Sequence, residues 1–146
     1  MTSLHRLLGA AIVLALLLLA VWGVVLRLMG REQAPVAFWG AQHWLENILI
    51  VQVVTGIVLL LMGRQLTGSG LIWLHYLYGS LFPLIALVGG RLAGLRRRDA
   101  GRIEYPGLIW GALIAWGLTL RALMLGCHLP ADITGLPACV LPGVFG

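Results

Sequence analysis

Two histidines open long apolar segments, and each is followed four residues later by a glycine. His5 precedes Gly9 and His75 precedes Gly79, both within the pattern Leu-His-x-Leu-x-Gly. Residues four apart share a face of a helix, so each segment places an imidazole one turn from a gap in the side-chain surface. An imidazole nitrogen can bind iron, and a gap accepts the edge of a flat ring. The spacing therefore predicts that His5 and His75 bind a haem iron between two helices.

The composition indicates that these helices lie in a membrane. Of the 146 residues, 60% are hydrophobic and 10% are charged, which is too apolar for a soluble domain of this size. About 20 apolar residues span a bilayer, and four stretches reach that length: 7–29, 45–63, 71–94 and 107–125. A large soluble catalytic domain is excluded. We predict an all-α integral membrane protein, with a bundle of four transmembrane helices in residues 1–125 and a tail in residues 126–146.

The arginines predict which way the bundle faces. Seven lie on the side of the loops that follow the first and third helices, and three lie on the side of the N-terminus: Arg27, Arg31, Arg91, Arg96, Arg97, Arg98 and Arg102, against Arg6, Arg64 and Arg121. Basic residues favour the cytoplasmic side, so both termini are expected outside a prokaryotic cell membrane. The arginines sit at helix ends, which indicates the lipid bilayer and not nucleic acid as their partner.

The repeated histidine motif also predicts the architecture. The first and second helices would form one hairpin and the third and fourth a second, related by a pseudo-twofold axis along the membrane normal. Repeats of this kind place a shared site at their interface, here between the first and third helices. His5 and His75 both begin their helices on the outer side, at roughly the same shallow depth. The two imidazoles are therefore expected to meet near the outer face.

Two axial histidines suit a low-spin b-type haem, one per chain; haem O or haem A would be held in the same way. A shallow haem would direct its propionates toward the outer interface, where Arg6 and Arg121 lie. Arginine binds carboxylates through two parallel hydrogen bonds, but arginines that simply extend from helix ends into the interface explain these positions equally well. Histidine also binds chlorophyll-type pigments, so the sequence leaves the pigment open.

His43 and Glu46 are expected at the cytoplasmic start of the second helix, three residues apart and on nearly the same face. Such a pair could transfer protons or bind a quinol, although an interfacial hydrogen-bonded pair is favoured. No second histidine lies on that side, which excludes a second bis-histidine haem within one chain.

The only two cysteines, Cys127 and Cys139, fall in the tail. The predicted topology places the tail outside the cell, where thiols are oxidised. Two cysteines there predict one disulfide that closes a small loop.

The chain resembles one four-helix half of the haem A synthases. The likeness rests on short motifs that follow one another along the chain: His5-Arg6, Gln52 with Gly56, His75, Gly117 with Arg121, and then Cys127 with Cys139. The resemblance implies a haem-holding bundle that acts as an oligomer and an oxidoreductase that oxidises a haem methyl group. The family has an acidic residue just before its His-Arg pair, whereas only Met1 to Leu4 precede it here, so enzymatic activity stays open.

Two functions remain. The first is a membrane b-type haem protein that transfers electrons or processes haem, as a homo-oligomer or as a subunit of a larger complex. The second is a haem-free accessory or assembly subunit of a respiratory or photosynthetic complex, with interfacial histidines. The repeated histidine setting favours the first. A transporter is disfavoured, because the sequence shows no discontinuous helix and no buried charge cluster at mid-membrane.

Overall fold

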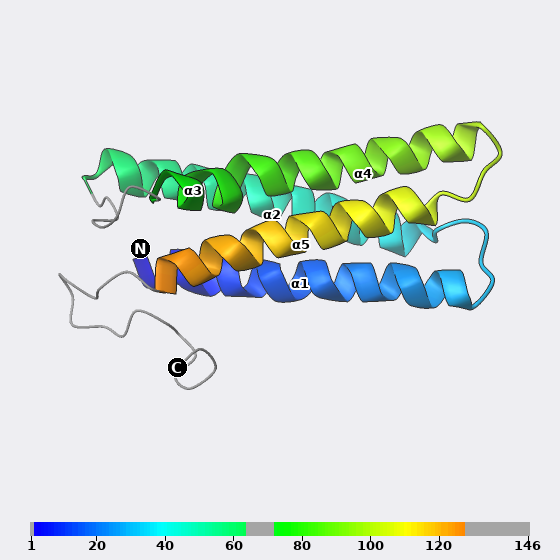
Figure 1. The fold of residues 1–146 in the computed structure, drawn as a ribbon, viewed down its shortest axis with the longest axis horizontal. Coiled ribbons are helices and arrows are strands. Elements are labelled where there is room, and N and C mark those ends of the chain that lie inside the picture. The colour runs from blue at the N-terminus through cyan, green and yellow to red at the C-terminus, as the bar shows by residue number, and fades with distance from the viewer. Residues whose placement is uncertain (1, 64–71, 128–146) are drawn as a thin grey trace.

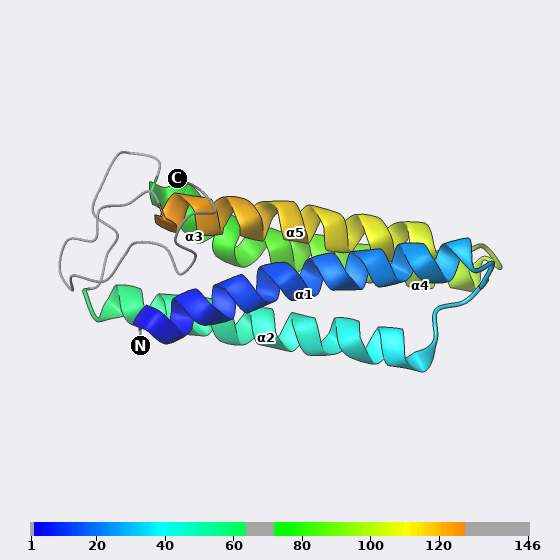
Figure 2. The same ribbon diagram turned by 90° about the horizontal axis from the view of Figure 1, so that it is seen from below.

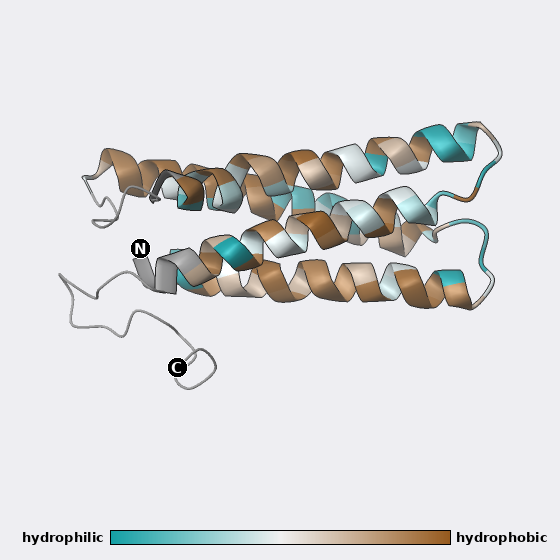
Figure 3. Cartoon of the chain, in the orientation of Figure 1, coloured by the Kyte–Doolittle hydropathy of each residue, from teal (hydrophilic) through white to brown (hydrophobic). Residues whose placement is uncertain are grey.

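The computed structural model describes residues 2–63 and 72–127, which form four long helices and confirm the predicted all-α bundle (Figure 1). The third helix consists of three consecutive segments. The elements are α1 (Thr2–Leu28), α2 (Val36–Leu61), α3 (Ile72–Tyr76), the π-helical turn η1 (Leu77–Leu81), α4 (Phe82–Asp99) and α5 (Tyr105–Cys127). All four helices are long and apolar enough to cross a membrane, and Figure 3 shows hydrophobic residues along most of their length.

Helix α2 is longer than the sequence predicted. It begins at Val36, nine residues before the expected start at 45, and directly after Pro35. A proline suits the start of a helix because it lacks the N–H that would have no partner there. The polar residues Gln42 and Glu46 do not end the helix, since both are buried on its inner face. The third helix likewise extends to Asp99, beyond the expected end at 94.

The helices run alternately in opposite directions. Helices α1 and α4 each pack against both α2 and α5, so α1 and the third helix occupy opposite corners of the bundle (Figures 1 and 2). One end holds the start of α1 and the end of α5, and we call it the histidine end. The loops 29–35 and 100–104 close the other, arginine-rich end. A site between the first and third helices would therefore lie across the bundle, flanked by α2 and α5.

Glycines bring the backbones of α4 and α5 into contact. A Cβ on Gly90 would lie 2.6 Å from the Cα of Gly111, and a Cβ on Gly107 would lie 2.8 Å from the backbone nitrogen of Gly94. Neither position leaves room for a side chain. Small residues four apart allow this close approach of membrane helices, so α4 and α5 form a tightly joined pair.

Helices α1 and α4 end in the same way. Gly30 and Gly101 have φ angles of 73° and 65°, and the residue after each glycine donates its N–H to the carbonyl five residues back. This is a Schellman motif, whose positive φ favours glycine. Both glycines belong to the pattern Arg-x-x-Gly-Arg-x-x-x-Pro, which spans 27–35 and 98–106. The two hairpins therefore repeat at their turns as well as at their histidines.

The spacing between the histidine and the turn is one residue longer in the second repeat than in the first, and η1 contains the extra residue. His75 follows His5 by 70 residues (75 minus 5), whereas Arg98 follows Arg27 by 71 (98 minus 27). Within η1 the N–H of Phe82 donates to the carbonyl of Leu77, five residues back. Such a π-helical turn accommodates one residue more than an α-helical turn. The third helix thus contains an extra residue between two ends that correspond to those of α1.

Contacts between its two loops stabilise the arginine-rich end. The N–H of Ala34 donates to Oε1 of Glu104, and the hydroxyl of Tyr105 donates to the carbonyl of Gln33 at 2.7 Å. Glu104 and Tyr105 are both buried, and the ring of Tyr105 meets Phe38 edge-on, with centroids 6.5 Å apart. The loop residue Glu104 therefore joins the two hairpins.

Candidate functional site

His75 lies in α3 at the histidine end, and the backbone of α5 determines its tautomer. Its Nδ1 is 2.9 Å from the carbonyl oxygen of Ala122. A carbonyl oxygen can only accept a hydrogen bond, so Nδ1 carries the proton and the neutral ring keeps a lone pair on Nε2. Histidines that bind metals usually donate their second N–H to a carbonyl or carboxylate in this way. The ring of His75 therefore has the orientation and the tautomer, with its proton on Nδ1, that an iron-binding histidine would have.

His5 lies in α1 at the same end, beside Gln52 of α2. The amide nitrogen of Gln52 donates to the backbone carbonyl of His5 at 3.1 Å, and the same nitrogen is 3.4 Å from Nε2 of the His5 ring. The second distance is long for a hydrogen bond. The other ring nitrogen, Nδ1, is buried without a hydrogen-bond partner among the described residues. Gln52 thus fixes the backbone of His5 and leaves its ring weakly bonded.

The two histidine settings match in three dimensions. His5 contacts a residue 47 positions later, Gln52, and His75 contacts a residue 47 positions later, Ala122. The glycine one turn after each histidine faces the same partner, because a Cβ on Gly9 would lie 3.4 Å from the Gln52 side chain and a Cβ on Gly79 would lie 3.4 Å from Ala122. The two hairpins are therefore built alike around their histidines.

The glycines of the site have little open space beside them. The edge of a haem ring would need more. At 3.4 Å, the added Cβ atoms at Gly9 and Gly79 would already be in van der Waals contact. Gly56 of α2 is similar, since a Cβ there would lie 3.5 Å from Cε1 of His5. In the described structure these glycines allow side chains to approach closely, and a haem would have to displace Gln52 or sit beside it.

His5 and His75 are both partly buried at the histidine end, in α1 and α3. A pair of axial ligands needs no third protein ligand, and no cluster of three or more His, Cys, Asp or Glu residues is present among the described residues. Two histidines are the number of axial ligands that a six-coordinate haem iron takes.

The predicted propionate partners lie at the histidine end. Arg6 is partly buried and follows His5 directly, and Arg121 is exposed on α5, one residue before Ala122. Arg64, Cys139 and the side chain of Cys127 lie outside the described residues, so the predicted disulfide stays a prediction.

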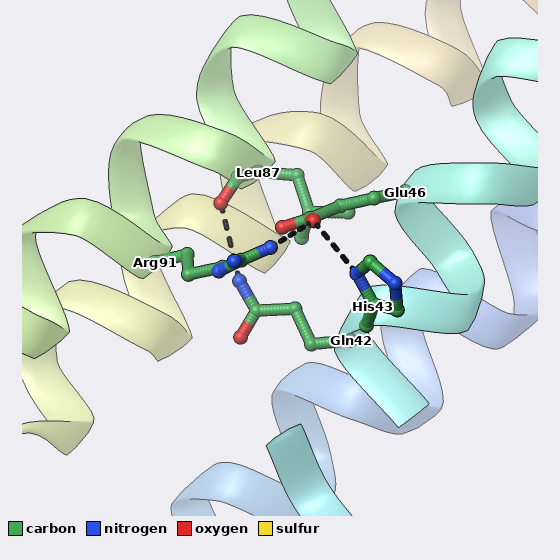
Figure 4. Close-up of polar contacts among 5 residues, drawn as sticks. All are labelled: Gln42, His43, Glu46, Leu87 and Arg91. Atoms are coloured by element: carbon green, nitrogen blue, oxygen red, sulfur yellow. Dashed lines mark hydrogen bonds and ion pairs between the residues drawn. The ribbon is translucent and has the colours of Figure 1, made fainter. Parts of the chain in front are cut away.

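A second polar cluster lies nearer the arginine-rich end, between α2 and α4 (Figure 4). Nη1 of Arg91 is 2.6 Å from Oε2 of Glu46, and Nδ1 of His43 is 3.7 Å from the same oxygen. The amide nitrogen of Gln42 donates to the carbonyl of Leu87 at 3.2 Å. The sequence placed His43 and Glu46 at the start of their helix, but they lie seven and ten residues inside α2.

The burial of this ion pair was not predicted from the sequence. From the sequence we expected no buried charge cluster at mid-membrane; Glu46, nearer the arginine-rich end, is only 5% exposed and is paired with Arg91. Arg91 was counted with the arginines of the helix end. The sequence did carry a signal for its role: Arg91 lies five residues before the run Arg96 to Arg98, more than one turn deeper.

No protein-family model, curated protein or solved structure matches this chain. The resemblance to haem A synthases therefore depends on the motifs of the sequence.

Proposed function

We propose that the protein is a membrane b-type haem protein that holds one haem between His5 and His75 and serves electron transfer. The observation that carries the proposal is the hydrogen bond from Nδ1 of His75 to the carbonyl of Ala122, which leaves Nε2 free to bind iron. The equivalent position of His5 in the other hairpin supports it. Bound haem would supply reversible one-electron chemistry, with a potential set by its ligands, burial and hydrogen bonds.

The chain's own residues would hold and orient the group. His75 would keep its ring orientation through Ala122, while His5 would keep its backbone position through Gln52. Arg6 and Arg121 would bind the propionates at the histidine end. We place this end at the outer face of a prokaryotic cell membrane, because the arginine-rich loops favour the cytoplasmic side.

Processing of haem, as the resemblance to haem A synthases implies, is the less supported form of this function. The described residues near His5 and His75 offer Gln52 and arginines but no carboxylate with a contact to either imidazole. Electron transfer needs only the ligands and a stable environment. The protein would act as a homo-oligomer or as a subunit of a larger membrane complex.

A haem-free accessory subunit is the second candidate. The close contacts at Gly9, Gly56 and Gly79 favour it, because side chains already occupy the space beside these glycines. In this case His5 and His75 would only join neighbouring helices.

The test is a reduced-minus-oxidised absorption spectrum of the detergent-purified protein, with His5→Ala and His75→Ala variants. We expect a low-spin b-type spectrum at about one haem per chain, lost in each variant because a six-coordinate iron needs both imidazoles. His43→Ala serves as the control, since His43 lies in the second polar cluster. A wild-type protein that stays colourless when haem is supplied during expression would contradict the haem function and support the accessory subunit.

A further inference from the structure

Asn47 is a polar side chain on the outer surface of a membrane-spanning helix. It lies in α2, 11 residues after Val36 (47 minus 36) and 14 before Leu61 (61 minus 47), and it is exposed. Its carboxamide can donate two hydrogen bonds and accept two, but it has no hydrogen-bond partner among the described residues. The surface of α2 therefore carries an unsatisfied amide near the middle of the helix.

The packing of α2 against α1 shows how deep Asn47 lies in the membrane. Nearer the arginine-rich end, the ring of Phe38 meets that of Trp22, with centroids 5.3 Å apart, and nearer the histidine end Gln52 contacts His5. Asn47 lies between these two levels, and so it is level with the apolar middle of α1. The bilayer core contains no water to bind the amide, so an unpartnered carboxamide at this depth is unfavourable.

The other amide and aliphatic hydroxyl side chains that the structure describes in the helices do have partners. Each donates a hydrogen bond to a backbone carbonyl: Gln42, Gln52, Thr55, Ser80 and Thr119. The chain thus satisfies these five groups internally, as polar groups within a membrane require. Asn47 differs from them, and its partner is therefore expected outside the bundle.

The residues around Asn47 suit packing against another helix. Four exposed residues spaced seven apart form what we call the α2 seam: Gly40, Asn47, Val54 and Leu61. The residues three and four positions after the first three of them are exposed as well: His43, Trp44, Ile50, Val51, Ile57 and Val58. A seven-residue repeat is the spacing with which two helices pair along their length. A Cβ on Gly40 would meet nothing within 4 Å, and Figure 2 shows α2 at the edge of the bundle.

A second copy of this chain is the occupant that the α2 seam fits. The arginine distribution gives every copy the same orientation in the membrane, so two copies related by a twofold axis along the membrane normal have parallel α2 helices. Each residue of the seam then meets its own counterpart at the same depth. A carboxamide is both a donor and an acceptor, so two copies of Asn47 can bind each other through two hydrogen bonds. Lipid tails offer no such partner.

We propose that the chain forms a homodimer through the α2 seam, with the two Asn47 side chains hydrogen-bonded to each other near the middle of the membrane. A single asparagine in an otherwise apolar helix contact also determines how the two helices align. The inference does not depend on a bound haem, because the seam lies on the outer face of α2, whereas Gln52 and Gly56 face His5 from its inner face.

The first experiment oxidises single cysteines with copper phenanthroline in native membranes, in a chain without Cys127 and Cys139. Val54→Cys leaves Asn47 in place and should form a disulfide-linked dimer, because each residue 54 meets its counterpart. Leu14→Cys is the matched control, since Leu14 is 58% exposed on α1 and nearly level with Asn47. We expect it to remain monomeric.

The second experiment compares wild type, Asn47→Val and Asn47→Gln by sedimentation over a range of protein-to-detergent ratios. Interhelical hydrogen bonds in membranes predict a dimer about 5- to 30-fold weaker in Asn47→Val. Asn47→Gln retains an amide and should stay closer to wild type. Circular dichroism checks that both variants keep the helical fold.

Three results would overturn the inference: a wild-type chain that stays monomeric at every ratio, equal cross-linking through Leu14→Cys and Val54→Cys, or an equally tight dimer after Asn47→Val. A wild-type chain whose residue 54 cross-links to a different membrane protein instead would also overturn it. None of these measurements detects haem, so the absorption spectrum tests the proposed function separately.

Discussion

Glu46 and Arg91 carry opposite charges into neighbouring membrane-spanning helices and neutralise each other there. Loss of one partner leaves the other charge unpaired. Removing one member of a buried pair typically costs about 3–5 kcal/mol. We expect Glu46→Gln to lower the free energy of unfolding by about 3 kcal/mol, near the lower limit because Arg91 is partly exposed.

The measurement is denaturant-induced unfolding in detergent, followed by circular dichroism. The double variant Glu46→Gln/Arg91→Gln should recover much of the loss, because neither side chain is then charged. Equal instability of the single and double variants would show that packing, and not the unpaired charge, causes the loss.

Single residues also show what the sequence can and cannot predict. The spacing of His5 and Gly9, repeated in His75 and Gly79, can be recognised because histidine is rare in this chain, which has four histidines. The partner of His75 was not predictable, since it is the backbone carbonyl of Ala122 and every residue has one. Arg91 was misinterpreted because its charge matched the arginines of the loop.

The α4–α5 pair illustrates how a helix contact depends on single glycines. Gly89 and Gly90 are adjacent, yet a Cβ on Gly90 would meet the backbone of α5, whereas one on Gly89 would meet nothing within 4 Å. We expect Gly90→Leu to lower the free energy of unfolding by about 3 kcal/mol or more, at or above the upper part of the range for overpacked cores. Gly89→Leu should stay near wild type.

Thermal unfolding of both variants in the same detergent compares them directly. If the two leucines had the same effect, helix propensity or lipid contact would explain the result better than the backbone contact.

The helices themselves were predictable, because each needs about 20 apolar residues and the chain has four such stretches. The residues at which the helices begin and end were harder to predict. The start of α2 was missed because Gln42, His43 and Glu46 read as polar residues of a helix end, while the structure buries Gln42 and Glu46 against α4. A polar inner face has no signature in hydropathy alone.

For the whole molecule, the distribution of arginines predicts that both termini face outward. In a chain without Cys127 and Cys139, we expect a membrane-impermeant thiol reagent to label Thr2→Cys on intact cells. Glu32→Cys and Ala100→Cys, in the two loops of the arginine-rich end, should be labelled only after the cells are opened. The opposite labelling pattern would show that the bundle has the inverted orientation, with His5 and His75 near the cytoplasmic face.

The π-helical turn η1 also affects which side chains of the third helix face the bundle. One residue added to an ordinary helix turns everything beyond it by about 100°, which in a membrane would point its buried side chains at lipid. The π-helical turn accommodates the extra residue within Leu77–Leu81. The two ends of the third helix therefore direct the same faces toward the bundle as the ends of α1 do. A comparison of the halves at a fixed offset therefore finds the histidines and loses the turns. The offset between the halves is 70 residues at the histidines (75 minus 5), 71 at the turn glycines (101 minus 30) and 70 again at the histidine partners (122 minus 52), so no fixed offset aligns all three.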